Sequence, residues 1–233
     1  LDNVAPTVSF AMPDAGSLLG PAFFAAGGVV AGAASDGVRA LKSVTLELAD
    51  GGAPQVATLG DGGWSAMVAA PAADDFTARS LRVFATDLAG NTATATMPVT
   101  VDVTPPTLAV TAPEMNAKFN AVTVGDGSVA LTWTMTDGDP LARVGLVLPD
   151  GGVRFNLPLS VATSPTDNPA TYSPTLIASD TAGNSSSAPT SFQVDRTPPT
   201  VASSTPPNNT RMWAGTLVAV DFSEPVTGDA GLL

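Results

Sequence analysis

The chain has 233 residues, a net charge of −12, and neither cysteine nor histidine. The missing residue types exclude disulfides, thiol chemistry and the Ser-His-Asp and Cys-His arrangements of nucleophilic catalysis. An acidic surface repels phosphate backbones, so we expect no nucleic acid partner. It attracts divalent cations instead.

The first repeat of the chain reads as a series of short strands. In residues 43–49, for example, Val44, Leu46 and Leu48 alternate with Thr45 and Glu47, which is the pattern of a half-buried strand. Turn signals rich in Asp and Gly separate such segments, and no stretch shows a helical pattern of useful length. Similar strands are predicted at residues 7–13, 29–34, 56–59, 64–68, 81–86 and 93–101.

Residues 15–35 carry no charge and are long enough to cross a membrane. Their five glycines and one proline favour a loop followed by a buried strand, so we expect no membrane insertion by this segment. The chain also lacks a basic, then apolar, N-terminal leader, which indicates a mature form or an excised piece.

Strands in the second half of the chain follow the same course. They are predicted at residues 108–112, 129–135, 144–148, 176–179 and 192–194, with a polar, proline-containing loop at 160–169. Further strands at 198–201 and 217–226 would begin another domain, which these residues alone could not close.

Repeated motifs divide the chain into domains. Residues 87–91 (Asp-Leu-Ala-Gly-Asn) are followed by residues 102–107 (Asp-Val-Thr-Pro-Pro-Thr), and the pair returns at residues 180–184 and 195–200. A weaker copy of the second motif begins at Asp2. A period of this length corresponds to one small domain per repeat.

We therefore predict domains at 1–101 and 102–194, and the start of a third at 195–233. The expected fold is all-β: tandem immunoglobulin-like antiparallel β-sandwiches joined by short Pro-Pro linkers. Proline has a fixed φ and no N–H donor, so each linker is short, stiff and extended, which gives a rod.

The repeated motifs resemble those of bacterial immunoglobulin-like (Big-type) repeats. The resemblance lies in an Ala-Ser-Asp-Gly turn, a Gly-Gly-Trp-Ser stretch, an Ala-Thr-Asp-x-Ala-Gly-Asn hairpin and a Val-Asp-x-Thr-Pro-Pro-Thr linker. In this chain they occupy residues 34–37, 62–65, 85–91 and 101–107, and the last two return at 178–184 and 194–200. The second repeat lacks the Trp-Ser stretch. Residues 222–226 (Phe-Ser-Glu-Pro-Val) are similar to another bacterial Ig-like subtype, found in surface-layer proteins.

The resemblance implies a non-enzymatic stalk or adhesin segment of a bacterial cell-surface or secreted protein. Its expected location is extracellular and its expected partners are further Ig-like repeats of the same chain. An accessory linker or carbohydrate-contacting module of a secreted enzyme is the alternative. The sequence names no ligand, because one such fold hosts many functions.

Aspartates of the motifs are expected to meet where one Ig-like domain joins the next. In such a sandwich the linker, the loop between the second and third strands and the last hairpin share one end. The second junction would then gather five oxygen-bearing residues: Asp102, Asp137, Asp139, Asp180 and Asn184. The first would gather Asp2, Asp36, Asp87 and Asn91. Carboxylate and amide oxygens suit calcium, and calcium-bridged junctions of related adhesin arrays favour the same ion.

A purely structural interpretation of these residues stays open. Asp87 and Asp180 would accept backbone N–H bonds across tight hairpins, in which Gly90, Asn91 and their counterparts tolerate positive φ. The adjacent carboxylates Asp74 and Asp75 could serve a glycosidase in principle, but they lie in a loop without elements that build a cleft. We expect no enzymatic activity.

Overall fold

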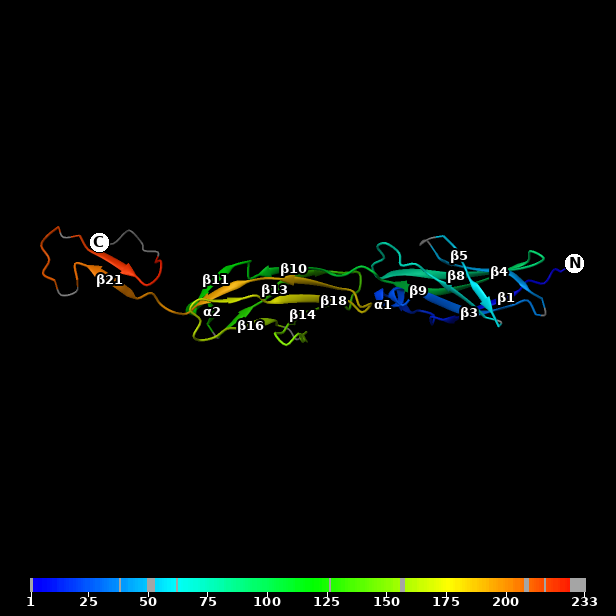
Figure 1. The fold of residues 1–233 in the computed structure, drawn as a ribbon, viewed down its shortest axis with the longest axis horizontal. Coiled ribbons are helices and arrows are strands. Elements are labelled where there is room, and N and C mark those ends of the chain that lie inside the picture. Colours follow the sequence, from blue (N-terminus) through cyan, green and yellow to red (C-terminus); the bar gives the residue numbers. More distant parts are fainter. Residues whose placement is uncertain are drawn as a thin grey trace. The chain divides into compact units, whose positions relative to one another are not determined.

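The protein is built almost entirely of β-strands, as a computed structural model of residues 2–37, 39–49, 53–61, 63–125, 127–155, 158–207, 210–215 and 217–226 shows (Figure 1). The chain divides into two compact units. Unit 1 holds Leu1–Ala112, Leu131–Leu159 and Pro174–Thr190, and unit 2 holds Pro113–Ala130, Ser160–Ser173 and Ser191–Leu233.

The first repeat forms two sheets within unit 1. One sheet has the order β1-β3-β7-β6 and the other has the order β2-β9-β8-β4-β5. The strands are β1 (Thr7–Met12), β2 (Leu18–Leu19), β3 (Val29–Ser35), β4 (Leu41–Leu48), β5 (Gln55–Val56), β6 (Thr58–Gly60), β7 (Gly63–Met67), β8 (Thr77–Asp87) and β9 (Thr92–Val101).

The two sheets enclose one hydrophobic core. Alternate residues of each strand point inward, so Val30 on β3 meets Leu46 on β4 and Leu81 on β8 within the same cluster of buried side chains. Trp64 on β7 is buried in this cluster, packs edge-on against Phe10 and donates its indole N–H to Ser9 O at 3.1 Å. This is the two-layer packing of a β-sandwich.

Two segments before β3 depart from the simple antiparallel pattern. β2 leaves the sheet that β1 began and pairs in parallel with β9. A single helical turn, α1 (Pro21–Ala25), follows β2, with proline at its first turn, where a missing N–H has no cost. The predicted loop before the buried strand therefore contains a short strand and a turn of helix.

Unit 1 also contains strands of the second repeat. β10 (Thr107–Ala112) pairs with β13 (Thr132–Thr136), as β1 pairs with β3. β15 (Val153–Arg154), β14 (Arg143–Val147), β18 (Thr175–Ser179) and β19 (Ser185–Pro189) form a sheet in that order, matching β5-β4-β8-β9. The repeat in sequence is therefore also a repeat in strand pairing.

Unit 2 contains the remaining strands and its own buried cluster. Phe192 and Val194 are fully buried together with Val124 and Val129, and Tyr172 stacks on Phe192. A helical turn, α2 (Ala121–Val124), is capped by Asn120 and Thr123 in a capping box. The strands are β11 (Ala117–Asn120), β12 (Ser128–Ala130), β16 (Ser160–Ala162), β17 (Ala170–Tyr172), β20 (Phe192–Asp195), β21 (Val201–Thr205) and β22 (Ala219–Phe222).

The predicted all-β fold is confirmed, with three corrections in detail. The segment at 160–169 begins with β16, because Ser160–Ala162 pairs with β12. β11 pairs in parallel with β20, as β2 does with β9. Two helical turns form where periodicity gave no signal, because a single turn is too short to show one. The predicted domain boundaries stay predictions.

Gly32 provides a test of the sheet packing. A Cβ at this position would lie 1.9 Å from Ser9 O and 2.8 Å from Trp64 Nε1. We expect Gly32→Ala to lower the free energy of unfolding by about 1–3 kcal/mol, because β1 or the indole must move. Gly60→Ala, where a Cβ meets nothing within 4 Å, is the control and should change it by no more than about 0.5 kcal/mol. Equal urea midpoints for both variants would contradict this packing.

Candidate metal centre

Each Asp-x-Ala-Gly-Asn hairpin is closed by its final asparagine. Asn91 donates its backbone N–H to Asp87 Oδ1 at 2.8 Å and its side-chain Nδ2–H to Asp87 Oδ2 at 2.7 Å. Asn184 makes the same two bonds to Asp180, again at 2.8 and 2.7 Å. Both oxygens of each hairpin aspartate thus accept hydrogen bonds from the asparagine four residues on.

The backbone of these hairpins corrects one expectation. Gly90 and Gly183 have φ of 95° and 94°, which suits glycine. Asn91 and Asn184 are not among the described residues with positive φ. The asparagines are therefore needed for their side-chain amides, which bridge the hairpin, rather than for backbone freedom.

The same amides tie each hairpin to a linker. Asn184 Nδ2 lies 3.3 Å from Asp102 O and 3.2 Å from Asp102 Oδ1. Asn91 Nδ2 lies 3.3 Å from Asp2 O and 3.2 Å from the carbonyl of Val4. Because the donor end of the amide faces these oxygens, Asn184 and Asn91 hold the linkers in place by hydrogen bonding.

Asp139 joins the loop after β13 to the second hairpin. Its Oδ2 accepts the backbone N–H and the hydroxyl of Thr181 at 2.7 and 2.5 Å, and its Oδ1 accepts Leu141 N–H at 2.8 Å. Burial acts to raise the pKa of Asp139, but these hydrogen bonds outweigh it and lower the pKa. Both oxygens are occupied, so Asp139 connects two loops.

Gly20 gives the second hairpin a close backbone contact. A Cβ on Gly20 would lie 2.2 Å from the carbonyl oxygen of Ala182, which is in the hairpin. Only glycine allows the chain before α1 to approach this carbonyl so closely. The hairpin is therefore fixed by backbone packing as well as by Asp139.

Three carboxylates meet beside this hairpin. One oxygen each of Asp75, Asp102 and Asp137 lies within 4.8 Å of the others, and we name these residues the linker cluster. Asp102 is fully buried, Asp137 is partly buried and Asp75 is exposed. Among the described residues, Asp102 Oδ2 and Asp137 Oδ2 are buried atoms without a hydrogen-bond partner. A buried carboxylate oxygen without a partner is costly and calls for a cation or a proton.

The electrostatics of the linker cluster favour a positive partner. Burial is the largest cause that raises the pKa of Asp102, and the charges of Asp180, Asp137 and Asp75 raise it further. Burial likewise raises the pKa of Asp137, followed by the charges of Asp75, Asp180 and Asp139. Each of these carboxylates disfavours the charged form of the others. A cation between them would offset this repulsion.

Asp75, a member of the linker cluster, was not among the residues predicted for this junction, because the sequence interpretation placed it in a loop without a cleft. Its Oδ1 accepts the Gly138 N–H at 2.9 Å, and a Cβ on Gly138 would lie 2.4 Å from that oxygen. A signal was available: Asp75 precedes the last long hairpin of the first repeat, so it lies at the end of that sandwich where the linker begins.

The neighbouring residue, Asp74, holds this loop in position. Arg79 donates to Asp74 Oδ1 and Oδ2 at 2.7 and 2.8 Å, and Asp74 is buried. The carbonyl of Asp74 accepts the backbone N–H of Val103 and the hydroxyl of Thr104, both at 2.9 Å. The pair Asp74 and Asp75 therefore anchors the linker and presents a carboxylate beside it.

A second set of carboxylates, the N-terminal cluster, consists of Asp2, Asp36 and Asp87, with one oxygen each within 4.8 Å of the others. Asp36 Oδ2 is also a buried atom without a partner among the described residues. Here, however, Arg39 Nη1 lies 3.0 Å from Asp2 Oδ2. The fourth residue predicted at this end, Asn91, hydrogen-bonds both oxygens of Asp87.

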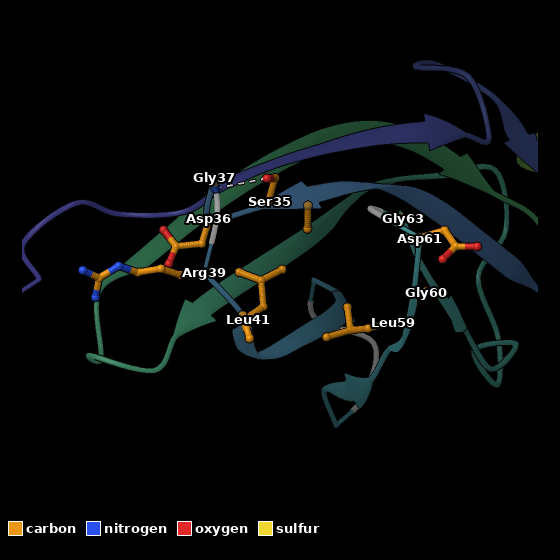
Figure 2. Close-up of a pocket in the computed structure, with 11 residues that line it drawn as sticks. Ser35, Asp36, Gly37, Arg39, Leu41, Leu59, Gly60, Asp61 and Gly63 are labelled. Carbon is orange, nitrogen blue, oxygen red and sulfur yellow. Dashed lines mark hydrogen bonds between the residues drawn. The ribbon is translucent and has the colours of Figure 1, made fainter.

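A shallow hollow adjoins the N-terminal cluster. Figure 2 shows Asp36 and Arg39 at one end of it and Asp61 near the other, with Leu41 and Leu59 between them. Its volume is about 390 Å³. Its described lining combines small, apolar and charged residues.

The donor set of the linker cluster decides its chemistry. Carboxylate oxygens are hard ligands, and the chain has no histidine or cysteine for a softer metal. Of the five residues predicted for this site, the structure places Asp102 and Asp137 in the cluster. Asp139, Asp180 and Asn184 surround it, with their hydrogen bonds directed to the hairpin and linker.

Comparison with known proteins adds structural neighbours only, since no protein-family model and no curated protein matches the chain. Fibronectin(III)-like modules of Clostridium thermocellum CbhA are 22% identical, covering 82% of this chain and 94% of that chain, with a TM-score of 0.38. A structure of a 1.5-MDa bacterial ice-binding adhesin is 19% identical. The match covers 87% of this chain and 69% of that chain, with a TM-score of 0.43.

A Ca2+-stabilized adhesin of an Antarctic bacterium is 27% identical and covers 87% of this chain, with a TM-score of 0.40. This chain spans 51% of that structure. These three neighbours are fibronectin III-like modules and adhesins. At these TM-scores, the fold assignment rests on the sheet topology of the chain itself. Among the described helices, none is long and apolar enough to cross a membrane.

The raised pKa of Asp102 predicts how metal-free stability depends on pH. Asp102 holds its proton more tightly in the folded state than in the unfolded state, where its pKa has the ordinary value of 3.8. Its ionisation therefore costs stability as pH rises from about 4 through the folded pKa. In chelator, Asp102→Asn should be more stable than the wild type at pH 7, and this difference should shrink towards pH 4. Urea unfolding at each pH measures it, and a difference independent of pH would refute the assignment.

Proposed function

We propose that this chain is a non-enzymatic stalk or adhesin segment of an extracellular bacterial protein, stiffened by calcium at the linker cluster. In this function the Ig-like repeats carry a binding domain away from the cell or hold neighbouring domains in order. The supporting observation is Asp102, a fully buried carboxylate with one oxygen left without a partner between two further carboxylates.

Calcium fits these residues better than other common cations. Asp75, Asp102 and Asp137 offer only oxygen, and calcium accepts six to eight oxygens at variable angles, including water and backbone carbonyls. Magnesium requires a stricter octahedron and gives up its water reluctantly, while zinc prefers nitrogen and sulfur. Asp75 is exposed, so water can complete the coordination on its side.

The cation would join three separate segments. Asp75 belongs to the loop before β8, Asp102 begins the linker and Asp137 follows β13. Asp102 is already fixed by Asn184, and the Asp75 loop by Arg79. A cation held by all three carboxylates would remove the repulsion between them and oppose any motion that separates these segments.

The absence of histidine and cysteine from the whole sequence supports a non-enzymatic function. Among the described residues that line the hollow in Figure 2, the one hydroxyl, that of Ser35, accepts the Gly37 N–H at 3.2 Å. Partners of this chain would be further Ig-like repeats, which follow from the same strand pairing in both halves. These features are those of a structural module.

Calcium binding tests the proposal. We expect calcium to raise the melting temperature of chelator-treated protein, by an amount equivalent to about 2.7 kcal/mol at a hundred times the dissociation constant. Asp102→Asn should abolish the calorimetric heat of binding, because it removes the central charge. Asp150→Asn, in an exposed turn, is the control and should bind as the wild type does. No heat and no change in melting at millimolar calcium would end the calcium hypothesis.

Small-angle X-ray scattering tests the stalk. The wild type should give the scattering of an elongated particle, and chelator should broaden its distribution of conformations because the carboxylates then repel one another. Asp102→Asn should show no response to chelator. A compact globule with and without calcium would contradict a stalk.

A further inference from the structure

The two acidic clusters share two pairs of equivalent aspartates, Asp2 with Asp102 and Asp36 with Asp137, and differ in the third, Asp87 or Asp75. Asp2 Oδ1 accepts the backbone N–H of Val4 at 3.1 Å, and Asp102 Oδ1 accepts that of Thr104 at 3.2 Å. In both cases the acceptor is the aspartate that opens the Pro-Thr linker motif, and the donor is two residues on. The first oxygen of each aspartate therefore has the same role.

The second oxygen is treated differently. Asp2 Oδ2 forms an ion pair with Arg39 Nη1 at 3.0 Å, whereas Asp102 Oδ2 has no partner among the described residues. The Asp2 side chain is 11% exposed and that of Arg39 is 63% exposed. The Arg39 guanidinium therefore lies beside the second oxygen of Asp2. The second oxygen of Asp102 is buried without such a partner.

The local sequence explains the difference. Asp36-Gly37 in the first repeat corresponds to Asp137-Gly138 in the second, and Arg39 then corresponds to Pro140. Arg39 is kept close by its backbone N–H, which donates to Asp36 O at 3.1 Å, and Figure 2 shows both side chains at the same end of the hollow. Proline offers no charge at the equivalent place.

We propose that Arg39 is the built-in cation of the N-terminal cluster and the residue that decides which cluster takes calcium. With Arg39 present, the N-terminal cluster is already partly neutralised and rejects a second positive charge. The linker cluster lacks such a residue and takes the divalent ion. This proposal rests on the proposed calcium site, which it makes selective for one of two similar clusters.

The charge of Arg39 is sufficient for this selection. A unit positive charge a few ångströms from a divalent ion opposes binding, and in a partly solvated site the effect exceeds a tenfold change in affinity. Arg39 is largely exposed, so replacing it should leave the fold intact. Its effect is therefore measurable without loss of the native state.

Calorimetric titration of calcium into chelator-stripped protein tests the inference. The wild type should bind one ion, and Arg39→Gln should add a second, weaker site. Arg39→Lys keeps the charge and should bind one ion. Arg82→Gln is the matched control: Arg82 lies in the middle of β8 and pairs with Glu47 at 3.7 Å, and its removal changes the net charge equally. One site in Arg39→Gln, or a second site in Arg82→Gln, would overturn the role of Arg39.

The double variant Asp102→Asn/Arg39→Gln separates this inference from the proposed function. If both hold, Asp102→Asn alone binds no calcium and the double variant binds one ion at the N-terminal cluster. Two sites of equal affinity in the wild type would overturn the selection by Arg39 while leaving calcium binding intact. If the wild type bound no calcium and Arg39→Gln bound one ion, calcium binding at the linker cluster would be overturned. The exclusion of calcium by Arg39 would stand.

Discussion

The burial of one carboxylate at the start of a linker governs the arrangement around it. Asp102 follows the last strand of the first repeat directly, and its side chain is fully removed from solvent. Its Oδ1 accepts from Thr104 N–H and Asn184 Nδ2, so one oxygen is satisfied by the protein. The other is not, and the cost of burying it is the strongest reason to expect a cation there.

The surrounding residues divide into supports and ligands. Asp180 and Asn184 brace the hairpin, and Asp139 fixes the hairpin to the loop after β13. The carboxylate oxygens of Asp139 and Asp180 accept these hydrogen bonds, whereas Asp75 and Asp137 lie with Asp102 in the linker cluster. Similar side chains in one region thus have separate physical roles, and hydrogen-bond occupancy distinguishes them better than residue type does.

The two clusters differ in a basic residue as well as in their third aspartate. Arg39 pairs with Asp2, whereas the second repeat has proline at the corresponding position. On the proposal above, two repeats of one fold would differ in cation binding while sharing two of their three aspartates. The acidic residues would then create a potential site, and the neighbouring positive charge would determine whether a free ion is required.

Local sequence determined the strands, the hairpins and the acidic ends of the repeats. Strict alternation around Leu46 and the Asp-x-Ala-Gly-Asn motif are enough for this, because a strand has a period of two and the hairpin bonds span four residues. The tertiary structure alone decided that Asp75 joins Asp102 and that Asp139 does not, since these contacts link residues far apart in sequence. It also decided that the free oxygen of Asp102 is buried, because burial depends on what packs around a residue rather than on its neighbours in the chain.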